Sequence, residues 1–301
     1  MTTDDGLSIP ALVEVHDPRM SGFRHDPKVR VHFDGGRWLE GPAYSAQSRT
    51  LLFSDIPSER ALRYDEVTGR TEVFDASSRF ANGRTYDGRG RLVTCLHGDR
   101  AVVRREHDGT ETVIARDYRG ARLNSPNDVV VDSSGAVWFT DPTYGILTDY
   151  EGHRASSEIA AGVYVVAPGA AGAEVAAEGF AQPNGLAFSP DESRLYVVDS
   201  ERDTLAELEP GARPAAARVI ASGHGFDGIR VDDAGRIWAG TRAGATCFDP
   251  DGTALVTISL PEQAANLEFG GPRRNILYIT ATTSLYSIMT SAVGAGGRLL
   301  P

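Results

Sequence analysis

Cysteine is scarce in this sequence, and the cysteines that are present do not suggest a framework. The 301 residues include two, Cys95 and Cys247. Two cysteines are too few for a disulfide scaffold, and their spacing does not match a metal knuckle. A reducing, cytoplasmic setting is therefore the expected localisation.

Positive charge is also scarce. The chain has 30 Lys and Arg against 41 Asp and Glu, for a net charge of −11, and Lys28 is its single lysine. An acidic chain repels a phosphate backbone, so nucleic acid is not expected as a partner. The same acidity is compatible with cation binding.

Long apolar runs are missing. The most apolar stretch, residues 159–177, is interrupted by Pro168, three glycines and Glu174, so it predicts two strands and a turn rather than a membrane span. The N-terminal residues do not show the basic-then-apolar pattern of a signal peptide. No membrane association is expected.

Two common catalytic signatures are absent as well. The 7 histidines include no H-E-x-x-H or H-x-H spacing, which disfavours a zinc site of those types. There is no G-x-S-x-G motif, which disfavours a serine-esterase mechanism.

What the sequence has instead is a repeat. Six segments each begin with an oxygen-bearing side chain and continue into a short strand; these lead residues are Glu40, Asn82, Asn127, Asn184, Asp227 and Asn266. They are spaced by 42, 45, 57, 43 and 39 residues. Self-similarity at about 40–50 residues is typical of propellers and solenoids.

Each complete repeat contains four short strands separated by turns, and turns of the second repeat, such as residues 87–90 and 107–109, contain Gly. The first repeat, for example, predicts strands at 41–45, 50–56, 61–65 and 70–75. Four strands with hairpin turns have the composition of a propeller blade. We therefore predict an all-β, six-bladed β-propeller with four antiparallel strands per blade.

The sixth repeat has only three strands, whereas a spare strand at residues 28–33 precedes the first blade. We predict that this N-terminal strand supplies the outer strand of the sixth blade and closes the ring, which removes an exposed edge. Residues 1–27 are then an N-terminal tail, and residues 28–301 form a single propeller domain. The longest insertion, residues 143–160 in the third repeat, is expected beside the mouth of the central channel.

In a radial fold the six lead residues converge on the axis. Taken singly, an Asn-Gly or Asp-Gly pair is also typical of a hairpin turn. Asn184-Gly185 argues against that alternative, because residues 180–183 before it do not form a strand with which it could pair. Recurrence at the same place in every repeat favours an axial polar cluster. Buried there, Glu40 and Asp227 need a compensating cation, and no lysine lies nearby in the sequence. An all-oxygen set in which amides outnumber carboxylates favours one Ca²⁺ ion, with Zn²⁺, Mn²⁺ or Mg²⁺ as alternatives.

A second set of acidic residues ends the next strand in three repeats. Asp55, Asp141 and Asp199 follow their lead residues by 15, 14 and 15 positions. Two interpretations remain open: these carboxylates join the axial cluster, or they cap turns at the strand ends.

Taken together and in order, these motifs resemble the senescence-marker-protein, gluconolactonase and luciferin-regenerating-enzyme-like family, from about Trp38 to Tyr286. The resemblance rests on residues 38–42, 126–132, 138–142, 144–145, 182–186 and 226–228. It implies a six-bladed propeller with one divalent cation, usually calcium, and hydrolysis of lactones. Similar enzymes of the fluorophosphatase type hydrolyse phosphorus esters.

The resemblance also implies roles for individual residues. It assigns the metal to Glu40, Asn127, Asn184 and Asp227, and it places Asn82 in contact with substrate. Two further substrate-binding candidates have simpler alternatives, because His97 could be a surface histidine and Tyr144 a packing residue.

The function expected on this basis is a divalent-metal-dependent lactonase that acts on a small sugar lactone such as gluconolactone. Asp227 is the candidate general base, with a cation-activated water as the alternative. In a phosphotriesterase, Asp227 would instead be the nucleophile. Ester hydrolysis of that kind and a non-catalytic calcium-binding propeller are the competing functions. The sequence does not indicate an oligomeric state.

Overall fold

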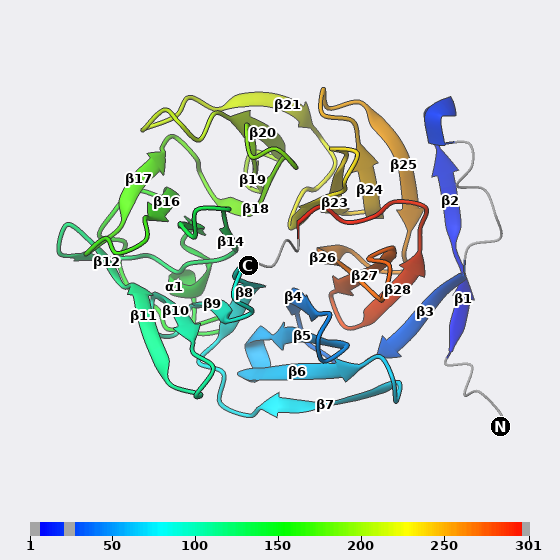
Figure 1. Ribbon diagram of the computed structural model, residues 1–301, viewed down its shortest axis with the longest axis horizontal. Coiled ribbons are helices and arrows are strands. Elements are labelled where there is room, and N and C mark those ends of the chain that lie inside the picture. The colour runs from blue at the N-terminus through cyan, green and yellow to red at the C-terminus, as the bar shows by residue number, and fades with distance from the viewer. Residues whose placement is uncertain (1–6, 21–27, 297–301) are drawn as a thin grey trace.

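The computed structural model describes residues 7–20 and 28–296 and shows six antiparallel sheets arranged in a ring (Figure 1). The predicted all-β, six-bladed propeller is confirmed. Within the described residues the helical segments include one four-residue α-helix, α1 (Tyr144–Leu147), and a 3₁₀ helix, η2 (Ile56–Ser58). None of the helices in this part of the chain has the length and apolar character needed to cross a bilayer.

The first three blades follow one another along the chain, each with its first strand innermost. Blade 1 consists of β4 (Leu39–Ser45), β5 (Thr50–Asp55), β6 (Arg60–Asp65) and β7 (Arg70–Asp75). Blade 2 consists of β8 (Ala81–Tyr86), β9 (Leu92–Leu96), β10 (Ala101–Arg105) and β11 (Glu111–Ala115). Blade 3 consists of β14 (Val129–Val131), β15 (Val137–Asp141), β16 (Gly162–Val166) and β17 (Glu174–Ala177). A small hairpin of β12 (Asp117–Tyr118) and β13 (Ala121–Arg122) precedes blade 3.

The last three blades repeat the plan. Blade 4 consists of β18 (Pro183–Phe188), β19 (Leu195–Asp199), β20 (Thr204–Leu208) and β21 (Arg218–Ser222). Blade 5 consists of β22 (Ile229–Val231), β23 (Ile237–Thr241), β24 (Gly244–Phe248) and β25 (Ala254–Ser259). Blade 6 takes β26 (Ala264–Gly270), β27 (Ile276–Ala281) and β28 (Leu285–Met289) from the end of the chain.

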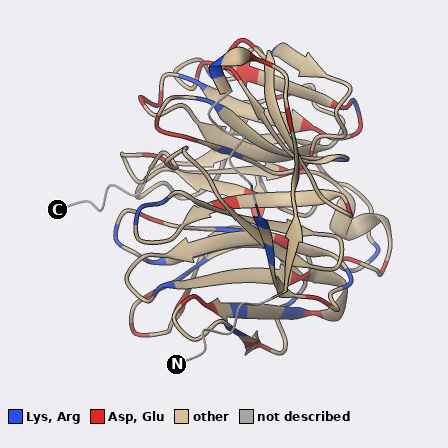
Figure 2. Ribbon diagram, turned by 90° about the vertical axis from the view of Figure 1, so that its right-hand side faces the viewer, with Lys and Arg blue, Asp and Glu red and all other residues tan. Residues whose placement is uncertain are grey.

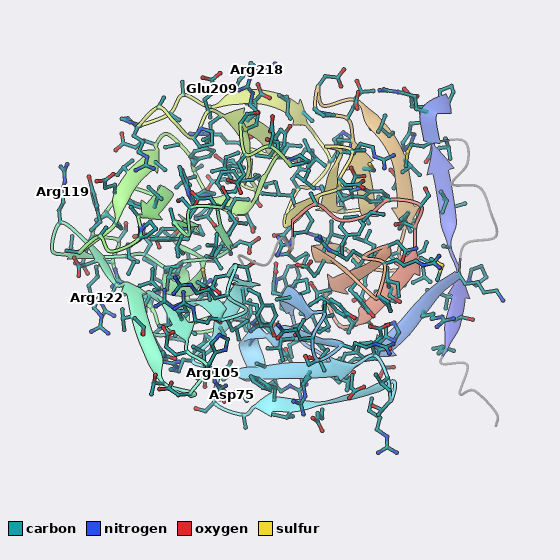
Figure 3. All side chains as sticks on the ribbon, viewed as in Figure 1. Asp75, Arg105, Arg119, Arg122, Glu209 and Arg218 are labelled. Carbon is teal, nitrogen blue, oxygen red and sulfur yellow. The ribbon has the colours of Figure 1, made fainter. Side chains whose placement is uncertain are left out.

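Burial within a blade decreases from the second strand outward. Every residue of β5, β15, β19 and β23 is buried, because neighbouring blades cover both faces of these strands. The outermost strand β7 is mostly exposed and carries charged side chains. Lys and Arg are interspersed with Asp and Glu over the ribbon (Figure 2). Labelled charged residues such as Arg119 and Arg218 lie at the outer rim of the ring (Figure 3).

The ring closes as predicted. Strand β3 (Lys28–Phe33) pairs antiparallel with β28 and becomes the outer strand of blade 6. Within the segment expected to be a tail, two further strands extend the sheets at the closure. Strand β1 (Ser8–Pro10) pairs with β3, and β2 (Leu12–Val15) pairs with β25 of blade 5. Blades 5 and 6 therefore have five strands each (Figure 1).

The closing strand carries a half-buried histidine, His32, that should make stability depend on pH. The Nε2 atom of His32 lies 2.7 Å from the Ser287 hydroxyl of β28, and its ring lies 4.3 Å from that of Tyr64. Burial, with a smaller contribution from the charge of Arg30, lowers the pKa of His32 to about 4. Below its ordinary pKa near 6.5 the unfolded chain takes up a proton that the folded chain does not, so stability falls as the pH falls from about 6.5 towards 4.

We expect His32→Gln to weaken this dependence. Between pH 7.5 and pH 5.0, the free energy of unfolding of the wild type should fall by roughly 2 kcal/mol more than that of the variant. Urea unfolding at both pH values and a fixed calcium concentration measures the difference. His107→Gln, at an exposed histidine, is the matched control and should follow the wild type. Parallel losses in His32→Gln and the wild type would contradict the prediction.

Candidate functional site

The predicted site residues lie around a cavity of about 280 Å³ at the propeller axis. The four predicted metal ligands, Glu40, Asn127, Asn184 and Asp227, contribute to its wall. So do two of the substrate-binding candidates, Asn82 and Tyr144. The other lining residues are Trp38, Glu151, Ser200, Gly225, Phe226, Arg242 and Gln263. Five of the six lead residues therefore line the cavity, and the sixth, Asn266, does not.

Local irregularities in the inner strands accompany this convergence. In blades 1, 2, 4 and 6 the register between the first two strands shifts at the lead residue. Such bulges redirect side chains away from the regular alternation of a strand. Asn127 and Asp227 lie two residues before β14 and β22, and their N–H groups donate to Thr140 and Gly240 of the neighbouring strand. The lead residues are therefore not hairpin turns.

The glycine that follows a lead residue has a packing role. A Cβ atom on Gly41 would lie 2.0 Å from the carbonyl oxygen of Asn82 in the next blade. A Cβ atom on Gly185 would lie 2.6 Å from the carbonyl oxygen of Asp227. The inner strands of adjacent blades can approach this closely only where no side chain intervenes. This approach explains the repeated Asn-Gly and Asp-Gly pairs better than a turn does.

Three buried oxygens of the cavity wall have no hydrogen-bond partner in the described part of the chain. They are Oδ1 of Asn82, Oδ1 of Asn184 and Oδ1 of Asp227. The orientation of Asn184 is fixed: the Ser200 hydroxyl donates its proton to the Phe226 carbonyl over 2.9 Å, so Ser200 can only accept from Asn184 Nδ2, 3.0 Å away. Buried polar atoms are normally paired, so three unpaired oxygens in one cavity indicate a binding site.

Glu40 and Asp227 are two of the three carboxylates that line this cavity, and Glu151 is the third. Burial raises the pKa of Glu40, and burial together with the charge of Glu40 raises the pKa of Asp227 well above its ordinary range. Glu40 is held in place by the N–H of Gly41 at 2.8 Å and by Nδ2 of Asn266 at 3.1 Å. The residues described here offer neither carboxylate an ion pair with Lys or Arg. A pair of uncompensated buried carboxylates is unfavourable unless a cation joins them.

This donor set fits a hard divalent cation. Carboxylate and amide oxygens are the ligands that Ca²⁺ takes in proteins. Over residues 7–20 and 28–296, no group of three or more His, Cys, Asp or Glu side chains is arranged to hold a metal. The candidate set contains only two carboxylates, with amides supplying the remaining oxygens, so it differs from the nitrogen and sulfur sets of zinc sites.

The other two substrate-binding candidates differ in position. Tyr144 lies at the start of α1 in the cavity wall, as the predicted location of the 143–160 insertion requires. His97 is 1% exposed and is not part of the wall. Its ring instead contacts Asn82 and the carbonyl of Glu151. The alternative of a surface histidine is therefore wrong. His97 lies behind the cavity-lining residue Asn82 rather than in the wall itself.

The second set of aspartates has a different role from the axial cluster. Asp55 accepts from the N–H of Arg37, Asp141 from that of Asn124, and Asp199 from that of Gln182. These N–H groups come two or three residues before Glu40, Asn127 and Asn184. Each aspartate thus anchors the loop that leads into a lead residue, and none of the three lines the cavity. The capping interpretation is the one that the structure supports.

Comparison with known proteins agrees with this geometry. Residues 38–283 match the model of the SMP-30/gluconolactonase/LRE-like region. The chain belongs to this family.

Relatives of the chain include a gluconolactonase of Zymomonas mobilis, 29% identical over 86% of this chain and 80% of that protein. The pentonolactonase XacC of Haloferax volcanii is 31% identical over 84% of each chain. Among solved structures, the gluconolactonase XC5397 of Xanthomonas campestris superposes with a TM-score of 0.88 at 33% identity, covering 95% of this chain and 98% of that one.

Sequence reasoning missed two groups of residues in this family member. Glu151, Arg242 and Gln263 line the cavity but lie in loops outside the lead motif. Asp128 and Arg230 were also missed, although one signal was available. Asp128 follows Asn127 where glycine follows four of the other five lead residues.

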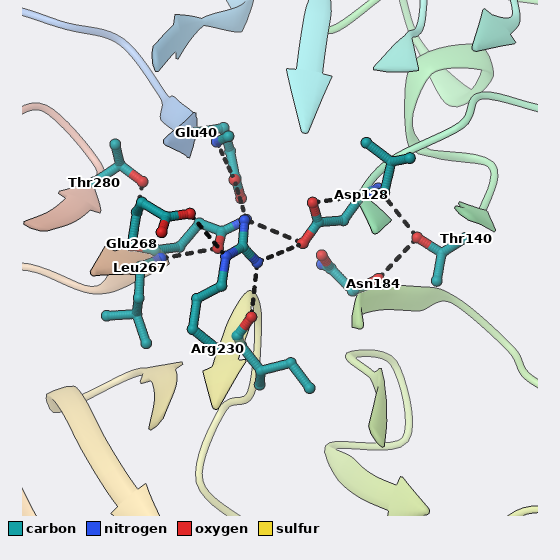
Figure 4. A network of polar contacts seen from close by, with 12 residues as sticks. Glu40, Asp128, Thr140, Asn184, Arg230, Leu267, Glu268 and Thr280 are labelled. Atoms are coloured by element: carbon teal, nitrogen blue, oxygen red, sulfur yellow. Dashed lines mark hydrogen bonds and ion pairs between the residues drawn. The ribbon is translucent and has the colours of Figure 1, made fainter. Parts of the chain in front are cut away.

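Asp128 and Arg230 belong to a polar network that also includes the lead residues Asn266 and Glu40 (Figure 4). Oδ2 of Asp128 lies 3.3 Å from Arg230 and 3.5 Å from Nδ2 of Asn266, the residue that also holds Glu40. Arg230 also pairs with Glu268 at 3.2 Å. Asp128 is fully buried, and the Arg230 side chain is 12% exposed. The network joins blades 3, 5 and 6 to Glu40 of blade 1.

Proposed function

We propose that this protein is a divalent-cation-dependent lactonase that opens sugar lactones to aldonic acids, with Ca²⁺ as the cation. Lactone hydrolysis is supported by the family and by relatives that act as a gluconolactonase and a pentonolactonase. The protein is thus a hydrolase of ester bonds whose substrates are small sugar lactones.

The observation that supports a bound cation is that one cavity contains several buried oxygens without hydrogen-bond partners among the described residues. Glu40, Asn127, Asn184 and Asp227 would hold it, because they combine two uncompensated carboxylates with amide oxygens. When bound, a divalent cation polarises a lactone carbonyl and stabilises the negative charge that develops on its oxygen.

The side chains of this protein supply the remaining chemistry. Asp227 takes the proton of the attacking water as the new bond forms at the carbonyl carbon. The ring C–O bond then breaks, and the proton passes to the ring oxygen, which becomes a hydroxyl of the acid product. Asn82 lines the cavity, and its buried Oδ1, which has no partner among the described residues, accepts a hydrogen bond from a hydroxyl of the sugar.

The nature of the cavity wall favours this substrate class over fluorophosphates. Asn82, Ser200, Arg242 and Gln263 are polar, and Trp38 and Phe226 supply the larger apolar surfaces. Polar groups placed to bind hydroxyls discriminate against substrates that lack them.

Removal and return of the cation test the proposal. After chelation we expect hydrolysis of glucono-1,5-lactone above the spontaneous rate to disappear and the melting temperature to fall, because Glu40 and Asp227 lose their compensating charge. Calcium should restore both, and Zn²⁺, Mn²⁺ and Mg²⁺ are added in parallel. Acid release in weak buffer and differential scanning calorimetry provide the two measurements. Full activity in the chelated protein, with no cation detected by elemental analysis, would refute cation dependence.

A further inference from the structure

We propose that His97 is a positioning residue that fixes two hydrogen-bond acceptors, Oδ1 of Asn82 and the carboxylate of Glu151, at the cavity, so that the site selects lactones bearing hydroxyl groups. This inference rests on the proposed lactonase function and adds the basis of its substrate selectivity.

The two ring nitrogens of His97 have different partners. Nδ1 lies 2.9 Å from the backbone carbonyl of Glu151, which can only accept, so Nδ1 carries the proton. Nε2 lies 3.3 Å from the side-chain amide of Asn82. Burial lowers the pKa of His97 to about 4, so the ring is neutral at pH 7 and Nε2 has no proton. Nε2 must therefore accept from the NH₂ group of Asn82.

The orientation of the Asn82 amide follows from this tautomer. With Nδ2 of Asn82 directed at His97, Oδ1 of Asn82 is the amide atom that remains without a partner. This oxygen is buried, and the residue that carries it lines the cavity. A flipped amide would direct its oxygen at an unprotonated ring nitrogen, which is repulsive. His97 thus makes Asn82 an acceptor towards the cavity.

The same ring fixes the loop that carries Glu151. A Cβ atom on Gly145 would lie 2.5 Å from Cβ of His97, and one on Gly152 would lie 2.1 Å from the carbonyl oxygen of Gly145. Gly145 and Glu151 of the 143–160 insertion therefore pack closely against His97. The side chain of Glu151 lines the cavity, and within the described residues its carboxylate has no hydrogen bond or ion pair.

Two unpaired acceptors call for donors on the ligand. The hydroxyl groups of a sugar lactone supply donors, whereas an unsubstituted lactone such as δ-valerolactone has none. A buried acceptor left unpaired on binding costs about 1–3 kcal/mol, which corresponds to roughly 5–150-fold in kcat/KM. The selectivity for glucono-1,5-lactone over δ-valerolactone should therefore depend on His97.

The test compares both lactones in the calcium-loaded wild type, His97→Phe, His97→Gln and Glu151→Gln. Phe keeps the ring volume and removes both hydrogen bonds. We expect His97→Phe to lower kcat/KM for glucono-1,5-lactone at least about tenfold, mainly through KM, and to change it less than about threefold for δ-valerolactone. His97→Gln, which keeps one donor and one acceptor, should recover part of the loss. Calcium affinity by titration calorimetry should stay within about threefold, since His97 does not line the cavity.

Glu151→Gln keeps the backbone carbonyl that His97 binds and removes the charged acceptor. It should lower the same ratio without changing the melting temperature, so it carries the test if His97→Phe does not fold. Equal losses on the two lactones, or a loss of calcium affinity in His97→Phe, would overturn the inference while leaving the lactonase function intact. A wild type that hydrolyses neither lactone would refute the proposed function and this inference with it.

Discussion

Replacement of Asp227 by Asn is expected to lower kcat for glucono-1,5-lactone by about 10³-fold or more and, in the cation-free protein, to raise the melting temperature. Asp227 is 6% exposed, its Oδ1 has no partner among the described residues, and burial together with the charge of Glu40 raises its pKa. Asn has the same shape but can neither take a proton from water nor neutralise a cation. The variant therefore removes the proposed chemistry together with an unfavourable buried charge.

Three measurements separate these effects. Initial rates of acid release give kcat, titration calorimetry gives calcium affinity, and melting in chelator gives the stability of the cation-free protein. We expect calcium affinity to fall and the chelated melting temperature to rise by at least about 3 °C. Asp251→Asn changes the same functional group at an exposed turn and should match the wild type in all three. Activity within tenfold of the wild type would show that Asp227 is not the base.

Replacement of Arg230 by Met is expected to lower the free energy of unfolding by about 3–5 kcal/mol, the cost of leaving a buried carboxylate without its partner. Arg230 contacts Asp128 at 3.3 Å and Glu268 at 3.2 Å, and Asp128 is fully buried. Met fills much of the same volume, so the loss arises from charge rather than from a cavity. Urea unfolding monitored by tryptophan fluorescence, at saturating calcium, measures it.

The double variant Asp128→Asn/Arg230→Met tests the cause. Removal of the stranded carboxylate should recover at least about half of the loss, which gives a large coupling energy between the two sites. Arg218→Met breaks an exposed pair with Glu207 on the outer rim and should cost less than about 1 kcal/mol. Additive effects of the two axial substitutions would contradict the compensation of Asp128 by Arg230.

Much of the fold could be predicted because its signals are local. Turn residues and alternating apolar positions set the strands, and the predicted 70–75 strand coincides with β7. The spare strand at 28–33 matched a blade with one strand missing, so ring closure followed from counting. The lead residues could be recognised because four blades repeat the same close approach to the next blade, which requires glycine after Glu40, Asn82, Asn184 and Asp227.

The role of Asp55, Asp141 and Asp199 could not be predicted from such local signals. An aspartate at a strand end has the same local sequence whether it faces a cavity or binds an N–H of a loop. Asp199 accepts from residues 17 and 18 positions earlier in the chain, and only the folded path of that loop places them within reach. His97 is a similar case, because its partner Glu151 is 54 residues away on the insertion.

The sequence by itself determined the six repeats, the strand order within each blade and the oxygen-bearing side chains that reach the axis, since hydrogen-bonded hairpins and glycine positions depend on neighbouring residues. Only the tertiary structure decided which charges meet. Asn266 reaches Glu40 across 226 residues, and Arg230 reaches Asp128 across 102, because closing a ring brings the ends of the chain and non-adjacent blades to one axis. A charge that is buried there, such as that of Asp128, is shielded from solvent, so the partners that the fold brings to it set its energetics.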